Sequence, residues 1–459
     1  MSERPPPLEL LPATRRALHR SLAVAQARGR APSVVAAVVR DGGPVWCEAR
    51  GTVDGEVPGA DTQYRVGSIT KTFVAVLVLR LCEEGLLAPG DRLEKHLPVP
   101  QGGGATVAQL LAHSAGLAAE ARGPWWERTP GELRPELADL FEEGAQKHPA
   151  GRRHHYSNPG YALLGALVEK LRGGEPWFGV LRREVLEPLG MTRTTLLPQA
   201  PHATGWAVHP YADVLQPEPA VDTGRMAPAG QLWSTAGDLC RFAAFLTVGD
   251  ERVLGARSLA AMRTPAVAPE VTDWESAYGL GMQVTRRGGR TLSGHSGSMP
   301  GFVAGLWTSP AEGVAGVAMA NATSGLAAAS LAAELVGLVA DHEPAVPPAW
   351  APMPDADPEL VALAGPWYWG TLPHALRVRA GRELELGPLT GGGRSSGFDP
   401  EPDGTWTGRE GYFAGETLRV VRRDDGTVSH LDLCTFVFTR EPYDPAAPVP
   451  GGTDPGGWR

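Results

Sequence analysis

A serine and a lysine three residues apart, in the stretch YRVGSITKTF, are the first candidates for chemistry. Residues three apart share one face of a helix, so Ser68 and Lys71 can meet if a helix begins at the serine. The helix N-terminus stabilises negative charge on the serine oxygen, and burial favours the neutral, basic form of the lysine. The pair could therefore act as a nucleophile with its general base. The same pattern is typical of a serine that only caps a helix, and these ten residues leave both interpretations open.

A second group, Tyr156-Ser157-Asn158, stands before the apolar stretch GYALLGALVEKL, with Pro159 suited to the first turn of a helix. A tyrosine phenol can relay a proton. An asparagine amide can hold a lysine amine with its oxygen and a substrate carbonyl with its nitrogen. Considered alone, Asn158 is interpreted more simply as a helix cap.

The third group, His295-Ser296-Gly297, lies in LSGHSGSMPGF at the end of a predicted strand. An edge strand beside a nucleophile can dock a substrate backbone and donate a backbone N–H to an oxyanion. A glycine-rich turn is the simpler interpretation of this stretch alone. The three groups together indicate an active site that none of them establishes separately.

The elements expected around these residues form one sheet assembled from both ends of a domain. Residues 9–28 show helical periodicity, and two strands are predicted around Asp41-Gly42-Gly43, a strong hairpin signal. Short strand patterns return over about 278–321 and lead into an Ala/Leu-rich helix at about 324–341. Because strands open and close this region, we expect an α/β (α+β) fold in which helices flank an antiparallel sheet.

Helices are expected to fill the chain between these strands. The helix after Ser68 is apolar almost all round, which predicts that it is buried, and Gly85 is suited to end it. A loop-rich helical insert is predicted over about 90–235 and carries Tyr156 and Asn158. We expect this insert to build walls of the substrate cleft.

A change in texture marks a second domain. The first domain is assigned to residues 1–342, and the Pro-rich segment 343–357 is predicted to be a linker. Residues 358–445 alternate in short strands with Gly and Asp turns, which predicts a small all-β domain, a sandwich or a barrel. The tail, 446–459, is predicted to be disordered.

Composition and charge exclude several functions. The formal net charge of the 459 residues is −9, which argues against a nucleic-acid partner. The four cysteines are far apart and form no C-x-x-C pair, and adjacent His154 and His155 lack a third ligand at a suitable spacing, so we expect no metal and no cofactor. The longest apolar runs are too short for a membrane span, and residues 1–20 lack the apolar core of a signal peptide. A cytoplasmic protein without a membrane partner is expected.

The order and context of the three groups resemble the superfamily of penicillin-binding proteins and class C β-lactamases, which are active-site serine enzymes. The resemblance extends from about residue 13 to 341 and implies a β-lactamase-like, transpeptidase-like fold. It rests on the stretches YRVGSITKTF, LLAHSAGL, YSNPGYALLGALVE, GQLWSTAGDLCRF and GHSGSMPGF. The C-terminal β domain is similar, in strand texture and position, to the lipocalin-like modules that follow the catalytic domain in some members.

The resemblance also implies roles for individual residues. Ser68 corresponds to the acylated nucleophile and Lys71 to its general base, with Tyr156 as a second proton relay. Asn158 is expected to position Lys71 and the substrate. The backbone N–H groups of Ser68 and Ser298 are expected to form the oxyanion hole.

The substrate-binding strand, His295-Ser296-Gly297, departs from the family pattern at its first residue. Many relatives carry the lysine of K-T-G there, which places a fixed cation beside a substrate carboxylate. Histidine is only partly charged near neutral pH. The resemblance therefore implies an esterase, an aminopeptidase-like enzyme or an acyltransferase, which often carry histidine or tryptophan here, in preference to a β-lactamase or carboxypeptidase.

Three functions follow from these observations. The first is a serine hydrolase that cleaves an ester or amide through an acyl-Ser68 intermediate, as an esterase or a D-amino-acid amidase or peptidase. The second is an acyltransferase or peptide-cyclising thioesterase that uses the same intermediate and takes a carrier-bound peptidyl thioester. The third is a non-catalytic binding protein on this fold. The expected partner of the first two is a small-molecule or peptide acyl substrate.

Overall fold

The computed structural model describes residues 9–99, 101–134, 136–267, 275–347, 349–355, 357–390, 392–444, 446–448, 452–453 and 456. The chain divides into two compact units, Met1–Val346 and Pro347–Arg459. Most of the predicted tail lies outside the described residues.

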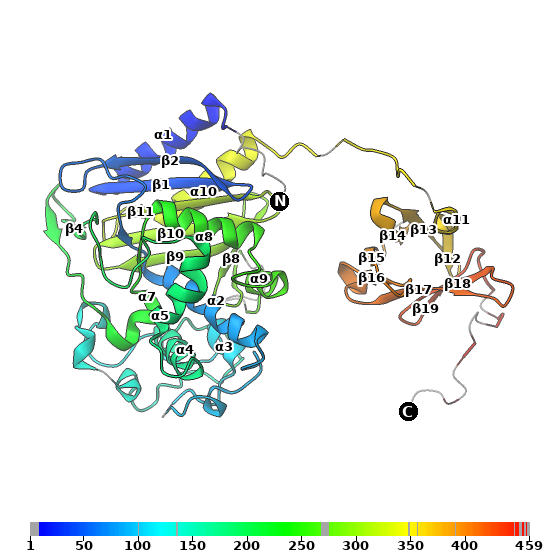
Figure 1. The fold of residues 1–459 in the computed structure, drawn as a ribbon, viewed down its shortest axis with the longest axis horizontal. Coiled ribbons are helices and arrows are strands. Elements are labelled where there is room, and N and C mark those ends of the chain that lie inside the picture. Colours follow the sequence, from blue (N-terminus) through cyan, green and yellow to red (C-terminus); the bar gives the residue numbers. More distant parts are fainter. Residues whose placement is uncertain are drawn as a thin grey trace. The chain divides into compact units, whose positions relative to one another are not determined.

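A seven-stranded antiparallel sheet, in the order β2-β1-β11-β10-β9-β8-β7, forms the centre of the first unit (Figure 1). Its strands are β1 Ser33–Arg40, β2 Gly43–Gly51, β7 Ser276–Tyr278, β8 Gln283–Arg287, β9 Arg290–Met299, β10 Phe302–Ser309 and β11 Val314–Ala320. Strand β1 pairs with β11, with Val34 opposite Ala320. This pairing confirms that the sheet is assembled from both ends of the domain. The predicted hairpin is also present, with positive φ angles at Asp41 and Gly42 as its turn requires.

The alternation of side chains along β1 explains why helices cover both faces of the sheet. Val34, Ala36 and Val38 belong to the core formed with α1 (Pro12–Gly29) and α10 (Ala328–His342). The intervening residues Val35, Ala37 and Val39 belong to the core on the other face. A strand that is apolar at every position needs partners on both sides, and β1 is buried almost throughout.

The second core is built by the helical part of the first unit. Its main helices are α2 Thr70–Glu83, α3 Val107–Leu111, α4 Asn158–Leu171, α5 Trp177–Leu181, α7 Ala227–Gly230, α8 Ala236–Val248 and α9 Ala256–Arg263; α6 Glu187–Leu189 is a single turn. As predicted, α2 is almost entirely buried, because α4, α5 and α7 pack around it (Figure 1). Gly85 follows its end with φ +72°.

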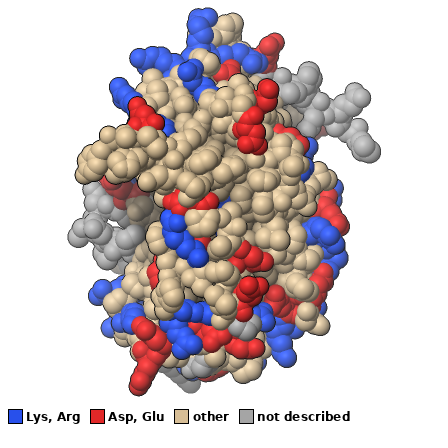
Figure 2. All heavy atoms as spheres, turned by 90° about the vertical axis from the view of Figure 1, so that its left-hand side faces the viewer, with Lys and Arg blue, Asp and Glu red and all other residues tan. Residues whose placement is uncertain are grey.

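Two short ladders connect the loops of the first unit. Strand β3 (Tyr64–Arg65) pairs with β6 (Trp233–Ser234), and β4 (Trp206–Val208) pairs with β5 (Leu215–Pro217). The β3–β6 ladder immediately precedes Ser68 and fixes the chain that leads to it. On the face drawn in Figure 2, Lys and Arg side chains are interspersed with Asp and Glu. Within the described part of the chain, no helix combines the length and apolar character needed to cross a membrane.

The second unit is an eight-stranded antiparallel sheet in which every strand pairs with the next along the chain. Its strands are β12 Gly365–Trp369, β13 Leu372–Val378, β14 Leu384–Pro388, β15 Ser396–Pro400, β16 Trp406–Gly408, β17 Thr417–Arg422, β18 Val428–Leu433 and β19 Phe436–Phe438. Backbone hydrogen bonds of 2.7 and 2.9 Å join Tyr368 to Thr439, so the first and last strands meet. The all-β prediction is confirmed, and this closure identifies a near-barrel. Its core surrounds Trp367 and includes Leu360 and Leu363 of α11 (Pro358–Leu363).

Candidate active site

Ser68 lies in a 3-10 turn, Gly67–Ile69, directly before α2, and Lys71 lies in the first turn of α2. The lysine Nζ lies 2.9 Å from Ser68 Oγ and donates a 2.6 Å hydrogen bond to the carbonyl oxygen of Ala229. Neither the turn nor α2 has a side-chain hydrogen bond at its N-cap residue. The serine hydroxyl therefore meets the lysine, and Ser68 is not the capping residue of either element.

Lys71 is buried, with 0% of its surface exposed. Burial lowers its pKa to about 7, and the carboxylates of Glu120 and Glu127 oppose part of this shift. The Ala229 carbonyl can only accept, so it fixes one N–H of the amine. A neutral lysine then has a lone pair that can face the Ser68 hydroxyl. This protonation state and geometry suit a general base at neutral pH.

Tyr156 contacts both members of this pair. Burial raises the pKa of its phenol, while a hydrogen bond with Ser68 acts in the opposite direction. Lys71 Nζ lies 4.9 Å from the centre of the Tyr156 ring. The ring of His113 stacks on the Tyr156 ring with their centroids 4.0 Å apart. The phenol is thus protonated at neutral pH and able to pass a proton to or from Ser68.

The edge of β9 faces the turn that carries Ser68. Pairing between β8 and β9 ends where Gln283 lies opposite Gly294. Beyond that point the Ser296 backbone N–H donates to the Gln283 side chain over 3.1 Å. Backbone N–H groups two residues apart in a strand point to the same edge. The N–H of Ser298 therefore points to the edge that β8 has left open.

Two glycines allow this edge to approach the nucleophile. A side chain at Gly297 would place its Cβ 1.9 Å from the carbonyl oxygen of Val66 and 3.3 Å from the backbone nitrogen of Ser68. A Cβ at Gly67, whose φ is +55°, would lie 2.4 Å from the backbone nitrogen of Ser298. The two backbone N–H groups of the expected oxyanion hole are thus brought together by positions that only glycine can occupy.

His295, on the same strand, is buried and neutral. Its Nε2 lies 2.7 Å from the Tyr278 phenol and its Nδ1 lies 2.5 Å from the carbonyl oxygen of Ser296. Because the carbonyl only accepts, Nδ1 carries the proton and Nε2 accepts from the phenol. Burial lowers the pKa of His295 to about 3, and the positive charge of Lys71 acts in the same direction. The strand therefore lacks the fixed cation that K-T-G would supply.

The helix that follows Tyr156 is capped by Ser157, not by Asn158. Ser157 Oγ accepts from the Gly160 N–H over 3.2 Å, which is the usual N-cap contact. The Asn158 side chain instead donates from Nδ2 to both oxygens of Glu120, each over 3.0 Å. Among the described residues, no hydrogen bond joins Asn158 to Lys71. The expected contact between these two residues stays a prediction.

Sequence reasoning missed four residues that organise this site. Ala229 holds Lys71, Tyr278 holds His295 and Glu120 holds Asn158. His113 accepts a hydrogen bond from the Ser157 backbone N–H over 3.0 Å, although 44 residues separate the two. None of these residues stands at a helical or strand spacing from the group that it holds. The only signal was that His113 belongs to the stretch LLAHSAGL.

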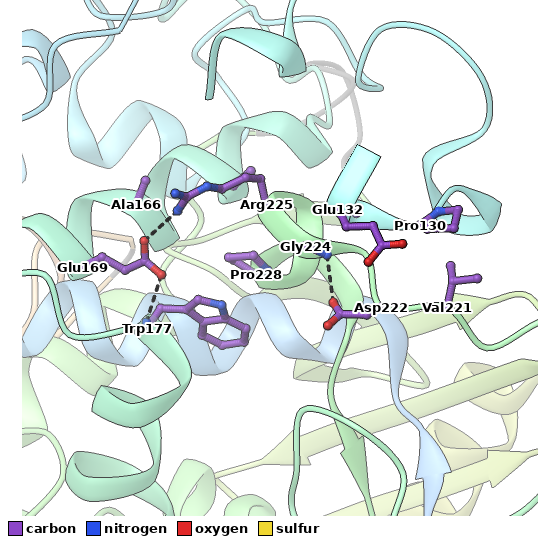
Figure 3. Close-up of a pocket in the computed structure, with 12 residues that line it drawn as sticks. Pro130, Glu132, Ala166, Glu169, Trp177, Val221, Asp222, Gly224, Arg225 and Pro228 are labelled. Carbon is purple, nitrogen blue, oxygen red and sulfur yellow. Dashed lines mark hydrogen bonds and ion pairs between the residues drawn. The ribbon is translucent and has the colours of Figure 1, made fainter. Parts of the chain in front are cut away.

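A pocket of about 640 Å³ lies beside α7 (Figure 3). Glu169 of α4 reaches Arg225 over 3.0 Å and accepts from the backbone N–H of Trp177, and Asp222 accepts from the Gly224 N–H. Among the residues that the structure describes, its lining includes none of Ser68, Lys71, Tyr156 and Asn158. Helix α7 thus contributes to two places, since Ala229 binds Lys71 and its neighbour Pro228 lines this pocket (Figure 3).

Comparison with protein families finds two matches. The model described as Beta-lactamase matches residues 18–341, and the model described as Domain of unknown function (DUF7586) matches residues 356–440. Penicillin-binding protein 4 of Amycolatopsis lactamdurans is 28% identical over 69% of this chain and 86% of its own length. The putative penicillin-binding protein PbpX of Bacillus subtilis is 28% identical over 52% of this chain and 57% of its own, so the chain spans less than two thirds of that relative.

Solved structures share the fold over one or both units. The octameric penicillin-binding protein homologue from Pyrococcus abyssi is 22% identical, with a TM-score of 0.63 over 93% of this chain and 99% of its own. SurE in complex with D-Leu is 25% identical, with a TM-score of 0.56 over 94% of this chain and 100% of its own. A D-stereospecific amidohydrolase from Streptomyces sp. is 26% identical, with a TM-score of 0.57 over 72% and 99%.

Proposed function

The chain belongs to the beta-lactamase family, whose members are serine hydrolases, and we propose that it cleaves an ester or amide through an acyl-Ser68 intermediate. The observation that carries this proposal is the buried Lys71, with its pKa lowered to about 7, beside the Ser68 hydroxyl at 2.9 Å. A lysine that is buried only for packing would not require a serine hydroxyl beside its amine, whereas a serine nucleophile requires a base of this kind.

Acylation follows from the positions of these groups. Ser68 Oγ attacks the carbonyl carbon of the substrate while its proton passes to Lys71 Nζ. The carbonyl oxygen becomes an oxyanion between the backbone N–H groups of Ser68 and Ser298, where each donor contributes roughly 3 kcal/mol. The C–N or C–O bond then breaks as the leaving group takes a proton through the Tyr156 phenol, which regains one from Lys71.

Deacylation repeats these steps with water in place of the serine. Water gives a proton through Tyr156 or Lys71 as its oxygen attacks the acyl carbon. The Ser68–acyl bond breaks, and the proton returns to Ser68 Oγ. The acid is released, and the site regains a neutral lysine. An amine that replaces water would give acyl transfer by the same route, so the acceptor separates the hydrolase from the acyltransferase or cyclising thioesterase.

The walls of the site support a particular class of substrate. Neutral His295 offers no cation to a carboxylate, which supports uncharged ester and amide leaving groups. Two proteins that are each about one quarter identical to this chain are a D-stereospecific amidohydrolase and SurE, the latter in complex with D-Leu. We propose that the acyl group is a D-aminoacyl group or the D-configured end of a peptide.

Ser68→Ala tests the acyl-enzyme directly. Intact-protein mass spectrometry should show one fluorophosphonate adduct on the wild-type chain and none on the variant. D-aminoacyl p-nitroanilides, their L-enantiomers and peptidyl thioesters, each offered with and without an amine acceptor, then identify the product. Labelling of the variant at the wild-type rate would remove Ser68 as the nucleophile. An unlabelled wild-type chain would favour the non-catalytic binding protein.

A further inference from the structure

We propose that the carboxylates of Glu120 and Glu127 bind the ammonium group of the acyl donor, so that the preferred substrate carries a free amine next to its scissile carbonyl. This inference rests on the proposed function and specifies the substrate of the same site.

Glu120 is held in place although the residue as a whole is exposed. Three contacts fix the loop that carries it: Ser157 Oγ donates to the Ala118 carbonyl over 2.7 Å, and the Asn158 N–H donates to the Ala119 carbonyl over 2.9 Å. The indole N–H of Trp126 then donates to Glu120 itself over 2.7 Å. The glutamate is nonetheless an exposed residue. A fixed and accessible anion beside a nucleophile is suited to a cationic group of the substrate.

The contact with Glu120 also decides which part of Asn158 a substrate meets. A carboxylate can only accept, so the atom of Asn158 that faces Glu120 must be the amide nitrogen. The amide oxygen Oδ1 remains, and among the described residues it accepts no hydrogen bond, although Asn158 is only 8% exposed. This oxygen is not among the fully buried side-chain atoms that lack a partner in the described residues, so a donor from solvent or from a substrate can reach it. Glu120 and Asn158 Oδ1 thus present acceptors only, which match the N–H groups of an ammonium.

The nearby cations leave these carboxylates without an ion-pair partner. Neither Glu120 nor Glu127 lies within 4.0 Å of a Lys, Arg or His nitrogen in the described part of the chain. Arg65, whose positive charge acts on Glu127, is 1% exposed and donates to the Gln231 side chain over 2.6 Å. Lys71 is directed to Ser68 and Ala229. The missing positive charge is therefore expected from the ligand.

Binding of an ammonium here would also prepare the base. The negative charges of Glu120 and Glu127 raise the pKa of Lys71 against the larger effect of burial. A substrate cation at Glu120 cancels part of this influence and favours the neutral, proton-accepting lysine. The recognition of the amine and the activation of Ser68 are thereby coupled through Lys71.

Paired substrates test the proposal. The wild-type chain is offered D-alanyl, D-leucyl and D-phenylalanyl p-nitroanilides, each with a free amine or an N-acetyl group, at pH 7.0, where a large fraction of the free amine is protonated. We expect a higher kcat/KM for the free amines. In Glu120→Gln, which keeps the shape and an acceptor for Asn158, kcat/KM for the free amines should fall about 10- to 100-fold. The N-acetyl substrates should change less than about 3-fold.

Controls separate binding from structure and from the proposed function itself. Glu143→Gln, an exposed glutamate of the same insert, should change neither series. Glu127→Gln should lower the ratio of kcat/KM for free-amine to N-acetyl substrates by a smaller factor than Glu120→Gln does. Glu120→Asp should lose less of this ratio than Glu120→Gln. Equal losses on both series would assign Glu120 a structural role and overturn the proposal. A wild-type chain that is labelled by fluorophosphonate but prefers the N-acetyl substrates would also overturn it. Absence of labelling would instead reject the acyl-enzyme.

Discussion

Two regions that border the site, strand β9 and the loop before α4, differ in the charge of their side chains. On β9, the basic residue His295 is buried against Tyr278, and burial lowers its pKa to about 3. The loop before α4 differs: it carries Glu120, an exposed residue whose carboxylate accepts hydrogen bonds from Asn158 and Trp126. One wall is neutral, and the other carries a carboxylate that has no ion-pair partner among the described residues.

This difference separates the chemistry from the specificity. Ser68 and Lys71 lie between the walls, in a geometry that any acyl-enzyme can use. A lysine at position 295 would favour substrates with a carboxylate, whereas an open glutamate favours substrates with an amine. The centre can therefore remain unchanged while the walls redirect it. Changes in the centre should affect all substrates equally, and changes in a wall should affect one class.

The largest effect is expected from Lys71→Met, which removes the base and leaves both walls intact. Activity on every ester and amide should fall on the order of 1000-fold, because Ser68 loses its proton acceptor. The folded state should tolerate the change, since methionine fills a buried apolar site. Steady-state kinetics with free-amine and N-acetyl anilides measure this loss, and Lys147→Met, at an exposed lysine, is the control. A loss confined to one series would contradict the separation of centre and walls.

Gly297→Ala should give the next largest loss by displacing the β9 wall. The new Cβ would lie 1.9 Å from the Val66 carbonyl oxygen, so the strand must move away from the turn that carries Ser68. The Ser298 N–H then leaves the oxyanion, which predicts a fall in kcat of about 100-fold. Gly337→Ala is the control, because a Cβ there meets nothing within 4 Å. Wild-type kcat in Gly297→Ala, measured on a folded sample by circular dichroism, would remove Ser298 from the oxyanion hole.

Restoring a cation to β9 sharpens the comparison between the walls. His295→Lys should raise kcat/KM for D-phenylalanyl p-aminobenzoate, whose leaving group carries a carboxylate, relative to D-phenylalanyl p-nitroanilide. We expect the ratio to change about 10-fold, because the new charge attracts the carboxylate. His295→Gln keeps the wall neutral and should leave the ratio unchanged. The same ratio of the two kcat/KM values in both variants would show that the charge of residue 295 does not affect the choice of leaving group.

The sequence predicted those parts of the molecule that depend on local spacing. Ser68 and Lys71 are three residues apart at the start of a helix, so their contact could be predicted from spacing. The strand patterns at both ends of the domain likewise predicted one shared sheet. Glu120 could not be assigned, because its hydrogen bonds to Asn158 cross 38 residues of loop. The neutral state of His295 depends on Tyr278 from another strand. Charge at the walls is thus a property of tertiary contacts, and the sequence showed only that His295 replaces a lysine.

The smallest expected effect connects the carboxylate wall to the base. Burial lowers the pKa of Lys71 to about 7, while Glu120 raises it in opposition. Glu120→Gln removes that opposition, so the pKa of Lys71 should fall further, and a larger fraction of the lysine is neutral below pH 7. With an N-acetyl substrate, which has no ammonium to lose, kcat/KM at pH 6 should therefore rise about 2-fold over the wild-type value. The rise should vanish at pH 8.5, where Lys71 is neutral in both proteins. A pH profile of kcat/KM from pH 5 to 9 measures it, and an acid limb at the same pH in both proteins would show that Glu120 does not act on Lys71.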